Sequence, residues 1–328
     1  TGAAIERVLV KDCEVTSDLP YLPVTPQNHY EIAWTSRLNF IRSLIDDGET
    51  DAYRIIKILE KFEKTHDLGI EQYSGPVRDL ETGLEQDIAD VYTGHTKWIE
   101  VPSANPEIAL PTGVHPVQEN SFLGEKLTLP AYTDISGIVA NWVIDLFDDS
   151  FDCIVEMGCG FGRNLFNIHK LGGPSNTPLY GGEYTKSGRE MAKLLAGLDR
   201  SIDIRIVEFD HCNVDFSFLD GEERVLAFTC HSIEQVPELS SSYFKEVSKA
   251  AKELTCLHFE PFGFQISTEN RYSKDQLNEF EKQEWNMNFF DTLKASAEIG
   301  EINLTHVMKD IIPNVSNSPT SFALWRNF

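Results

Sequence analysis

Three glycines at alternate positions, Gly158, Gly160 and Gly162, lie in the stretch DCIVEMGCGFGRNLFNIHKLG. They follow a short apolar run and precede a segment with the pattern of a helix. Glycine allows a tight turn. Because glycine has no side chain, a ligand can also approach the backbone at the start of the helix, where N–H groups are unpaired. An ordinary strand-to-helix turn also uses glycine, so this spacing alone leaves both interpretations open.

Carboxylates accompany the glycine loop. Glu156 lies two positions before the first glycine, where it would repel a pyrophosphate and favour a cation. Glu183 follows Gly162 by 21 positions, at the end of the next predicted strand, where a carboxylate can bind both hydroxyls of a ribose. We expect its removal to weaken ligand binding with little effect on folding, because strand ends are solvent-accessible. These residues predict a nucleoside ligand that carries positive charge and no phosphate.

The composition of the chain limits its partners. The 328 residues carry a net charge of −24, with no Lys- and Arg-rich block, so we expect no nucleic-acid partner. The longest apolar window, SGIVANWVIDLF, is too short for a membrane span, and no signal peptide is expected. The six cysteines form no CxxC pair, so we expect no metal site or disulfide framework and a reduced, cytoplasmic protein. The oligomeric state stays open.

The pattern of the chain changes near residue 130. Before it, apolar residues recur at helical steps over 34–45 and 52–62, with a weaker stripe over 80–91. Five prolines between positions 98 and 130 predict an irregular segment of the kind that often covers an active site. We therefore predict that residues 1–130 form an N-terminal helical region with a Pro-rich crossing segment.

Residues 131–328 alternate between strand and helix patterns. Short apolar runs at 151–157, 178–184, 203–210, 224–230 and 255–262 are predicted strands. Predicted helices separate or flank them, including one that starts at residue 133, one over 240–254 and one that runs from Trp285 to Ala297. Such alternation predicts a parallel sheet with helices on both faces. The last two runs, 302–312 and 320–327, have no long helix between them and are predicted to pair antiparallel. The fold class is thus α/β, with a Rossmann-like, doubly wound, mostly parallel sheet and an antiparallel C-terminal edge.

These motifs, in this order, resemble those of the class I S-adenosylmethionine-dependent methyltransferases over about residues 131–328. VEMGCGFGRN is similar to the glycine-rich first motif of the family, and AFTCHSIEQVPEL is similar to its fourth. The resemblance implies that Glu183 binds the ribose and that Asp210, in EFDHCN, meets the adenine amino group. It also implies S-adenosylmethionine as the cofactor and S-adenosylhomocysteine as the product. A dinucleotide oxidoreductase is the weaker alternative, because the G-x-G-x-x-G spacing is absent.

Tyr184 and His211 either flank the adenine by stacking on it or face the core, and both readings stay open. The predicted cofactor ligands are Glu156, Gly158, Gly160, Gly162, Glu183, Tyr184, Asp210 and His211.

His231 directly follows the fourth predicted strand and is the candidate general base. A neutral histidine can take the proton of a hydroxyl acceptor near neutral pH. The alternative is a histidine that bonds the backbone or packs under a substrate loop. Glu234 is the second catalytic candidate, with a first-turn carboxylate favoured by the helix dipole as its alternative. His258, in the adjacent strand, is expected to be buried and hydrogen-bonded, with a place in the pocket lining beside Glu260 as the alternative.

The acceptor is predicted to be a small metabolite or a saccharide. The Asn/Asp-Pro-Pro-Tyr motif of amide- and base-methylating members is absent, which favours methylation of a hydroxyl. An N- or C-methyltransferase in which His231 orients the acceptor, and a non-catalytic scaffold, remain alternatives. Polar acceptor contacts are predicted for five side chains, with ordinary surface and helix roles as the alternative: Arg163, Arg271, Trp285, Asn286 and Asn288.

Overall fold

A computed structural model of the chain describes residues 29–63, 66–67, 76–78, 85–87, 99–100, 117–130, 137–315 and 318–327. The chain divides into two compact units. One comprises Thr1–Pro116 and Thr185–Asp199, and the other comprises Val117–Tyr184 and Arg200–Phe328. Most of the predicted Pro-rich crossing segment, and the start of the helix expected from residue 133, lie outside the described residues.

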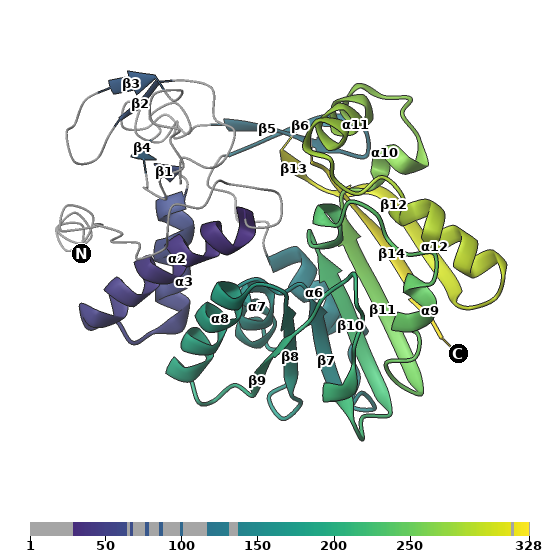
Figure 1. The fold of residues 1–328 in the computed structure, drawn as a ribbon, viewed down its shortest axis with the longest axis horizontal. Helices are drawn as coiled ribbons and strands as arrows, with labels where there is room; N and C mark the ends of the chain where they lie inside the picture. The colour runs from purple at the N-terminus through teal and green to yellow at the C-terminus, as the bar shows by residue number, and fades with distance from the viewer. Residues whose placement is uncertain are drawn as a thin grey trace. The chain divides into compact units, whose positions relative to one another are not determined.

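A seven-stranded sheet forms the centre of the second unit (Figure 1), and its strand order is β12-β14-β11-β10-β7-β8-β9. The strands are β7 (Cys153–Met157), β8 (Leu179–Glu183), β9 (Ile204–Glu208), β10 (Arg224–Cys230), β11 (Glu253–Glu260), β12 (Asn303–Ile312) and β14 (Thr320–Arg326). The first five run parallel, whereas β14 is antiparallel to both β11 and β12. The predicted doubly wound sheet with an antiparallel edge is confirmed.

The direction of winding reverses at β7. From there the chain moves outward through β8 and β9, and then returns to β10 on the other side of β7. In open α/β sheets such a reversal leaves a crevice at the carboxyl ends of the strands, because the neighbouring connections pass to opposite faces. The glycine loop follows β7 and therefore lies at this point.

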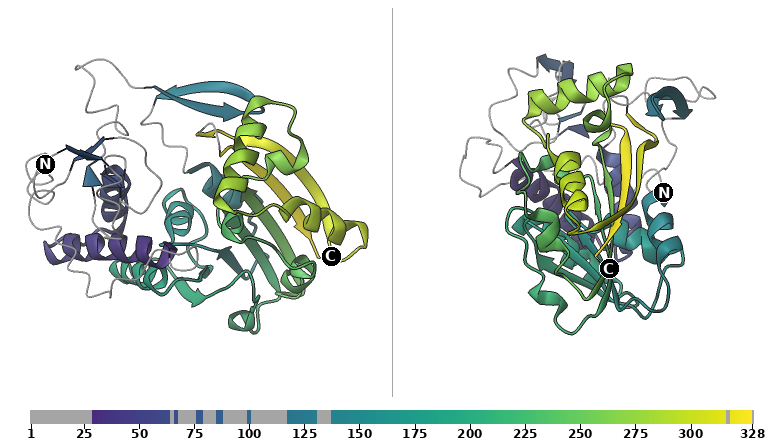
Figure 2. Two further views of the ribbon diagram at one scale, coloured as in Figure 1. Left: turned by 45° about the horizontal axis from the view of Figure 1, so that its top comes forward. Right: turned by 90° about the vertical axis from the view of Figure 1, so that its right-hand side faces the viewer.

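Helices cover both faces of the sheet, as the side view in Figure 2 shows. On one face, Trp142 packs edge-on against Phe259 and Phe322. On the other face, Phe244 packs edge-on against Trp325. The helices of this unit are α6 (Gly137–Leu146), α7 (Arg163–Lys170), α9 (Tyr243–Val247), α10 (Gly263–Ile266), α11 (Arg271–Gln283) and α12 (Phe289–Glu298).

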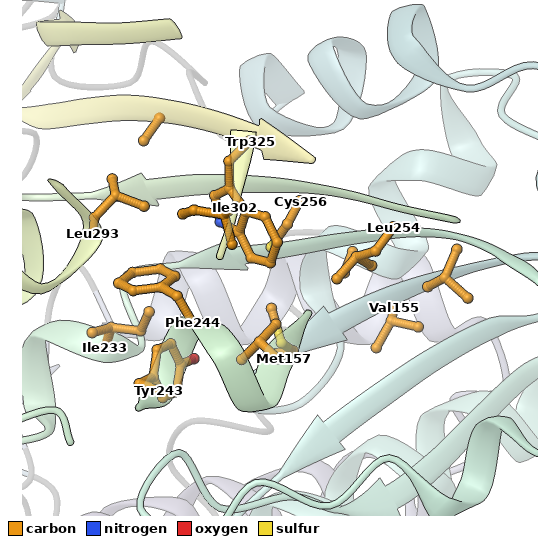
Figure 3. Close-up of a cluster of buried hydrophobic side chains, with 14 of the residues drawn as sticks. Val155, Met157, Ile233, Tyr243, Phe244, Leu254, Cys256, Leu293, Ile302 and Trp325 are labelled. Atoms are coloured by element: carbon orange, nitrogen blue, oxygen red, sulfur yellow. The ribbon is translucent and has the colours of Figure 1, made fainter. Parts of the chain in front are cut away.

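The main buried cluster lies on the face that carries α9 and α12 (Figure 3). Val155 and Met157 alternate along β7 toward this face, and Phe244 of α9, Leu293 of α12 and Trp325 of β14 belong to the same cluster, with almost no exposed area. Burying such a side chain contributes about 1.5–3 kcal/mol. This packing holds the carboxyl ends of β7, β10 and β11 in a constant arrangement.

The N-terminal unit contains α2 (His29–Asp46), α3 (Ala52–Glu63) and α8 (Lys186–Leu198). The first two confirm the helical stripes predicted before residue 63. Glu31 of α2 caps α8, because its carboxylate accepts hydrogen bonds from the backbone N–H groups of Lys186 and Ser187, at 2.9 and 3.1 Å. A carboxylate at a helix N-terminus also matches the positive end of the helix dipole.

The weaker stripe predicted over 80–91 is wrong at 85–87, which is a strand rather than a helix; its other residues lie outside the described part of the chain. A four-stranded sheet has the order β1-β4-β2-β3. It is made of β1 (His66–Asp67), β2 (Pro76–Arg78), β3 (Glu85–Asp87) and β4 (Ile99–Glu100). Antiparallel pairing with β2 overrides the weak helical periodicity.

The expectation of irregular chain from residue 98 to residue 130 is also wrong, both at Ile99–Glu100, which form β4, and in its last part. β5 (Val117–Phe122) and β6 (Glu125–Pro130) form a hairpin, and β13 (Asn314–Val315) extends it. Leu123 and Gly124 have φ values of 52° and 80°, the paired positive values of a two-residue hairpin turn. Pro130 stands at the end of its strand, where a missing N–H is tolerated.

Two helix predictions need correction near the C-terminal half. The helix expected over 240–254 is confined to α9, because Glu253 already begins β11. Trp285 lies between α11 and α12 rather than in a helix. Glu284 ends α11 with a left-handed φ of 56°, which breaks the periodicity that linked Trp285 to the helix after it.

Among the described helices, none combines the length and the apolar character that crossing a membrane requires.

Candidate functional site

All three loop glycines have left-handed backbones, with φ values of 82°, 53° and 84° at Gly158, Gly160 and Gly162. Residues other than glycine rarely adopt this backbone conformation. A Cβ on Gly158 would also lie 2.3 Å from the Cβ of Ser232, so this glycine permits a close approach between the loop and the end of β10. α7 begins directly after the third glycine.

Glu183 contacts this loop. Its Oε2 accepts a hydrogen bond of 3.0 Å from the backbone N–H of Gly160, and the residue is only 6% exposed. The expectation that its removal would affect folding little assumed an exposed strand end. The burial of this carboxylate contradicts that assumption. Glu183→Ala would also leave the Gly160 N–H without this acceptor.

Glu156 is a second buried carboxylate beside the loop, 1% exposed. Its Oε1 accepts a hydrogen bond of 2.6 Å from Asn164 of α7, while Oε2 is buried with no hydrogen-bond partner among the described residues. Burial raises the pKa of Glu156 to about 8, although the Asn164 hydrogen bond acts in the opposite direction. The group is therefore largely protonated at neutral pH, and a nearby cation would favour its ionised form.

Asp210 and His211 follow β9 and take part in local hydrogen bonds. Asp210 Oδ1 accepts from the Cys212 N–H at 2.8 Å, which closes a turn. His211 lies with Nδ1 2.8 Å from the Tyr243 hydroxyl and Nε2 3.3 Å from the Ser232 hydroxyl. Burial lowers the pKa of His211 to about 4, so its ring is neutral.

Tyr184 differs from His211 in its surroundings, because it is 62% exposed. The predicted adenine contacts of Asp210, His211 and Tyr184 stay predictions. Of the two readings left open for each aromatic ring, the hydrogen bonds of His211 favour the core-facing one, and the exposure of Tyr184 favours contact with a ligand.

His231 begins the loop after β10 with a positive φ of 50°. Its Nδ1 lies 3.3 Å from Glu234 Oε1, and its Nε2 lies 2.6 Å from the hydroxyl of Thr320. Burial lowers the pKa of His231, but the charge and hydrogen bond of Glu234, together with Glu260, outweigh it and raise the pKa above 6.5. The structure thus brings the two predicted catalytic residues into contact.

Glu260, at the end of β11, was not among the predicted site residues. Both of its carboxylate oxygens lie 3.1 Å from the backbone nitrogen of Ser232, which donates to them. The Ser232 hydroxyl in turn donates to the Met157 carbonyl at 2.9 Å, so the ends of β7, β10 and β11 are joined. Burial and the neighbouring Glu234 raise the pKa of Glu260 to about 7. The sequence signal was an acidic residue ending an apolar strand.

His258 is buried and hydrogen-bonded, as expected. Trp325 Nε1 donates to His258 Nε2 at 2.8 Å, so the ring proton is on Nδ1, which lies 2.9 Å from the Thr229 hydroxyl. Burial lowers the pKa of His258 to about 3. This neutral ring is part of the core beneath the site.

The two predicted asparagines are engaged by neighbouring backbone. Asn286, 1% exposed, donates to the Val236 carbonyl at 2.8 Å, and its Oδ1 accepts from the Phe289 N–H at 2.7 Å. Asn288 both accepts from and donates to the backbone of Leu239, at 2.9 Å in each case. These contacts are those of loop-holding residues, and a role in binding the acceptor stays a prediction.

The other predicted acceptor residues lie at separate places. Arg163 is the first residue of α7, next to the glycine loop. Trp285 packs edge-on against Phe280, and Arg271 pairs with Asp275 on an exposed turn of α11. Their roles toward a substrate stay predictions.

The described sheet and its site can be compared with known folds. The parallel five-stranded part, wound outward on both sides of β7 and closed by the β12 and β14 pair, has the strand order of the class I methyltransferases. The chain has a class I methyltransferase-like fold. No protein-family model and no curated protein sequence matches it.

Several solved methyltransferase structures share parts of this fold. A geranyl diphosphate C-methyltransferase from Streptomyces coelicolor is 13% identical over 58% of this chain and 77% of its own, with a TM-score of 0.39. The CcbJ methyltransferase from Streptomyces caelestis is 11% identical over 60% of this chain and 93% of its own, with a TM-score of 0.39. The methyltransferase domain of the bacterial CtHen1-C is 16% identical over 58% and 98%, with a TM-score of 0.38. Because these similarities are distant, the function of the chain has to be inferred from its strand order and from the geometry of its site.

Within this methyltransferase-like fold, the side chains around the loop suit a ligand that is cationic. Glu156 has a buried oxygen with no hydrogen-bond partner in the described part of the chain, and Glu183 lies against the loop at the end of the adjacent strand. In the described part of the chain, no group of three or more His, Cys, Asp or Glu side chains is arranged to hold a metal ion.

Proposed function

We propose that the protein is an S-adenosylmethionine-dependent methyltransferase that methylates a hydroxyl of a small molecule or saccharide. The observation that carries this proposal is the contact between Glu183 and the Gly160 amide at the point where the sheet reverses its winding. A carboxylate in this position is suited to the hydroxyls of a ribose. The geranyl diphosphate C-methyltransferase from Streptomyces coelicolor is described with S-adenosylhomocysteine bound, which agrees with this choice of nucleoside.

The residues around the loop fit the cofactor chemically. The glycines would allow the amino-acid part of the ligand to approach the backbone, and Glu183 would hold the ribose. Glu156 would face a positive charge, which gives its unpartnered oxygen a reason to be buried. The bound cofactor would supply an electrophilic methyl group on a sulfonium, so the protein contributes alignment and proton handling.

His231 would act as the general base for a hydroxyl acceptor. The hydroxyl proton would pass to the imidazole while the oxygen forms its bond to the methyl group, and the methyl–sulfur bond would break with its electron pair staying on sulfur, which leaves S-adenosylhomocysteine. Glu234, 3.3 Å from Nδ1, would stabilise the resulting imidazolium. The raised pKa of His231 agrees with a ring that holds a proton well once it has accepted it.

A second candidate is an N- or C-methyltransferase in which His231 only orients the acceptor. The hydrogen bond between His231 Nε2 and Thr320, at 2.6 Å, favours this alternative, because it occupies the nitrogen that is not paired with Glu234. The hydroxyl mechanism requires this bond to open, because a Thr320 hydroxyl that donates to Nε2 occupies the lone pair that must take the proton of the acceptor.

Calorimetric titration with S-adenosylmethionine, S-adenosylhomocysteine and NADH tests the cofactor assignment. We expect both sulfur nucleosides to bind without added metal, and NADH to bind weakly or not at all. A folded protein that binds neither of them would contradict the proposal, and comparable NADH binding would support the oxidoreductase alternative. A screen of acceptors with labelled S-adenosylmethionine, analysed by mass, then identifies the methylated atom.

A further inference from the structure

His231 has a strained backbone conformation. Its φ of 50° lies in the left-handed region, which residues other than glycine seldom adopt. Leu123 and Glu284 share this conformation at a hairpin turn and a helix end, whereas His231 lies where a strand meets a loop. Such strain persists only where the surrounding groups hold it, and it is common at functional sites. Specific contacts must therefore hold His231 in place.

The end of β11 binds the backbone of this turn at two successive N–H groups. The His231 N–H donates to the Phe259 carbonyl at 3.0 Å, a bond between backbone groups that does not depend on a side chain. The Ser232 N–H donates to the carboxylate of Glu260, with both oxygens at 3.1 Å. The second bond therefore depends on the identity of residue 260 and on the length of its side chain.

Glu260 can hold this backbone because it is itself fixed. It is 2% exposed, and the Thr229 hydroxyl of the neighbouring strand donates a hydrogen bond to it. Burial and the nearby Glu234 raise the pKa of Glu260 to about 7, so its charge changes near neutral pH. An oxygen can accept from Ser232 in the ionised and in the protonated form. The bond to the turn therefore does not require a charge.

Ser232 connects the turn to the glycine loop. A Cβ on Gly158 would lie 2.3 Å from the Ser232 Cβ, and the Ser232 hydroxyl donates to the Met157 carbonyl at 2.9 Å. A displacement of Ser232 would thus move His231 relative to the loop in which the cofactor is proposed to bind. Such a displacement would affect the reaction, because methyl transfer depends on the alignment of the reacting groups.

We propose that Glu260 is a positioning residue for His231. By binding the Ser232 N–H, its carboxyl group holds the left-handed turn. The turn directs the imidazole so that Nδ1 lies 3.3 Å from Glu234 and Nε2 lies 2.6 Å from the Thr320 hydroxyl. In this role Glu260 acts through Ser232 and needs no contact with the reacting atoms. This inference rests on the proposed function, because it takes His231 to be the residue that handles the acceptor.

Two variants separate the reach of Glu260 from its charge. Glu260→Gln keeps an oxygen at the same distance and removes the charge, whereas Glu260→Asp keeps the charge and shortens the side chain by one methylene. NMR of protein labelled with nitrogen-15 histidine, above the pKa of His231, shows which ring nitrogen carries the proton, and His231→Asn assigns the signals. We expect one fixed tautomer, with the proton on Nδ1 facing Glu234, in the wild type and in Glu260→Gln. Glu260→Asp should show the average of two tautomers.

The matched control Glu253→Asp shortens a partly exposed carboxylate at the start of the same strand, and it should leave the His231 signals unchanged. With the acceptor found by the screen, kcat should fall roughly 10²-fold in Glu260→Asp and stay near the wild-type value in Glu260→Gln. A role in stability alone would lower the resistance of Glu260→Asp to urea without changing the tautomer.

A single tautomer that persists in folded Glu260→Asp, or one that is lost in Glu260→Gln, would overturn the inference. If Glu260→Asp does not fold, hydrogen exchange of the Ser232 amide decides instead, and fast exchange in the wild type or in Glu260→Gln contradicts the inference. Calorimetry with S-adenosylhomocysteine tests the proposed function separately. A wild-type protein with one fixed tautomer that binds no sulfur nucleoside contradicts the proposed function alone. One that binds the nucleoside but has an averaged His231 ring contradicts this inference alone.

Discussion

Replacing Glu183 by alanine removes one contact that is present in the protein and one that is expected with the cofactor. The present contact is the 3.0 Å hydrogen bond from Gly160, made by a carboxylate that is 6% exposed. Because Gly160 is only half-buried, water can replace part of this bond, and the free energy of unfolding should fall by less than the about 1–3 kcal/mol that a fully buried, unpaired N–H costs. The expected ribose contact adds a charged hydrogen bond of about 1.5–3 kcal/mol, roughly ten- to hundredfold in affinity.

Glu183→Gln separates the two effects. Its amide oxygen can still accept from Gly160, so we expect near wild-type unfolding in urea but weaker binding of S-adenosylhomocysteine by calorimetry. Glu208→Gln, which removes the exposed carboxylate paired in register with Glu183 on β9, should change neither quantity. If Glu183→Gln and Glu183→Ala both bind the nucleoside as the wild type does, the carboxylate does not hold the ribose and the placement of the cofactor is wrong.

Three further predictions concern titratable groups. His231→Ala should retain cofactor affinity and lose about 10²–10⁴-fold in turnover. The wild-type rate should rise with pH through a pKa above 6.5. Full activity in His231→Asn would instead indicate that His231 only orients the acceptor. The pKa of Glu156 is raised from 4.5 to about 8, so between these pH values the folded protein keeps a proton that the unfolded chain loses. The wild-type free energy of unfolding should therefore fall as pH rises across that range. Glu156→Gln should lessen this slope of stability against pH, measured by urea titrations. Binding of a cationic cofactor should also release this proton, which calorimetry in buffers of different ionisation enthalpy detects. The same measurement on Glu156→Gln should show no such release. His258→Phe should lower the free energy of unfolding by about 1–3 kcal/mol, since the Trp325 N–H loses its acceptor, and a changed nucleoside affinity in this variant would contradict its structural role.

The amino-acid sequence by itself determined the parts of this protein that depend on neighbouring residues along the chain. Strand and helix periodicity predicted the central sheet and its antiparallel edge, because a buried strand needs an apolar run whatever its partners are. The glycine loop was predictable because three left-handed residues at alternate positions require glycine locally. Glu183 could be predicted for a similar reason, because its place at the end of a strand follows from the position of the apolar run that precedes it in the sequence.

Tertiary structure alone decided how each acidic side chain is used. Glu156 and Glu234 each bury one oxygen that has no hydrogen-bond partner among the described residues, and Glu260 accepts from a backbone N–H 28 positions away in the sequence. His211 is neutral because it is buried between Tyr243 and Ser232, which no local pattern indicates. Desolvation and hydrogen bonding depend on which distant residues the fold brings within a few ångströms, so the protonation of these groups is a property of the folded protein rather than of any motif.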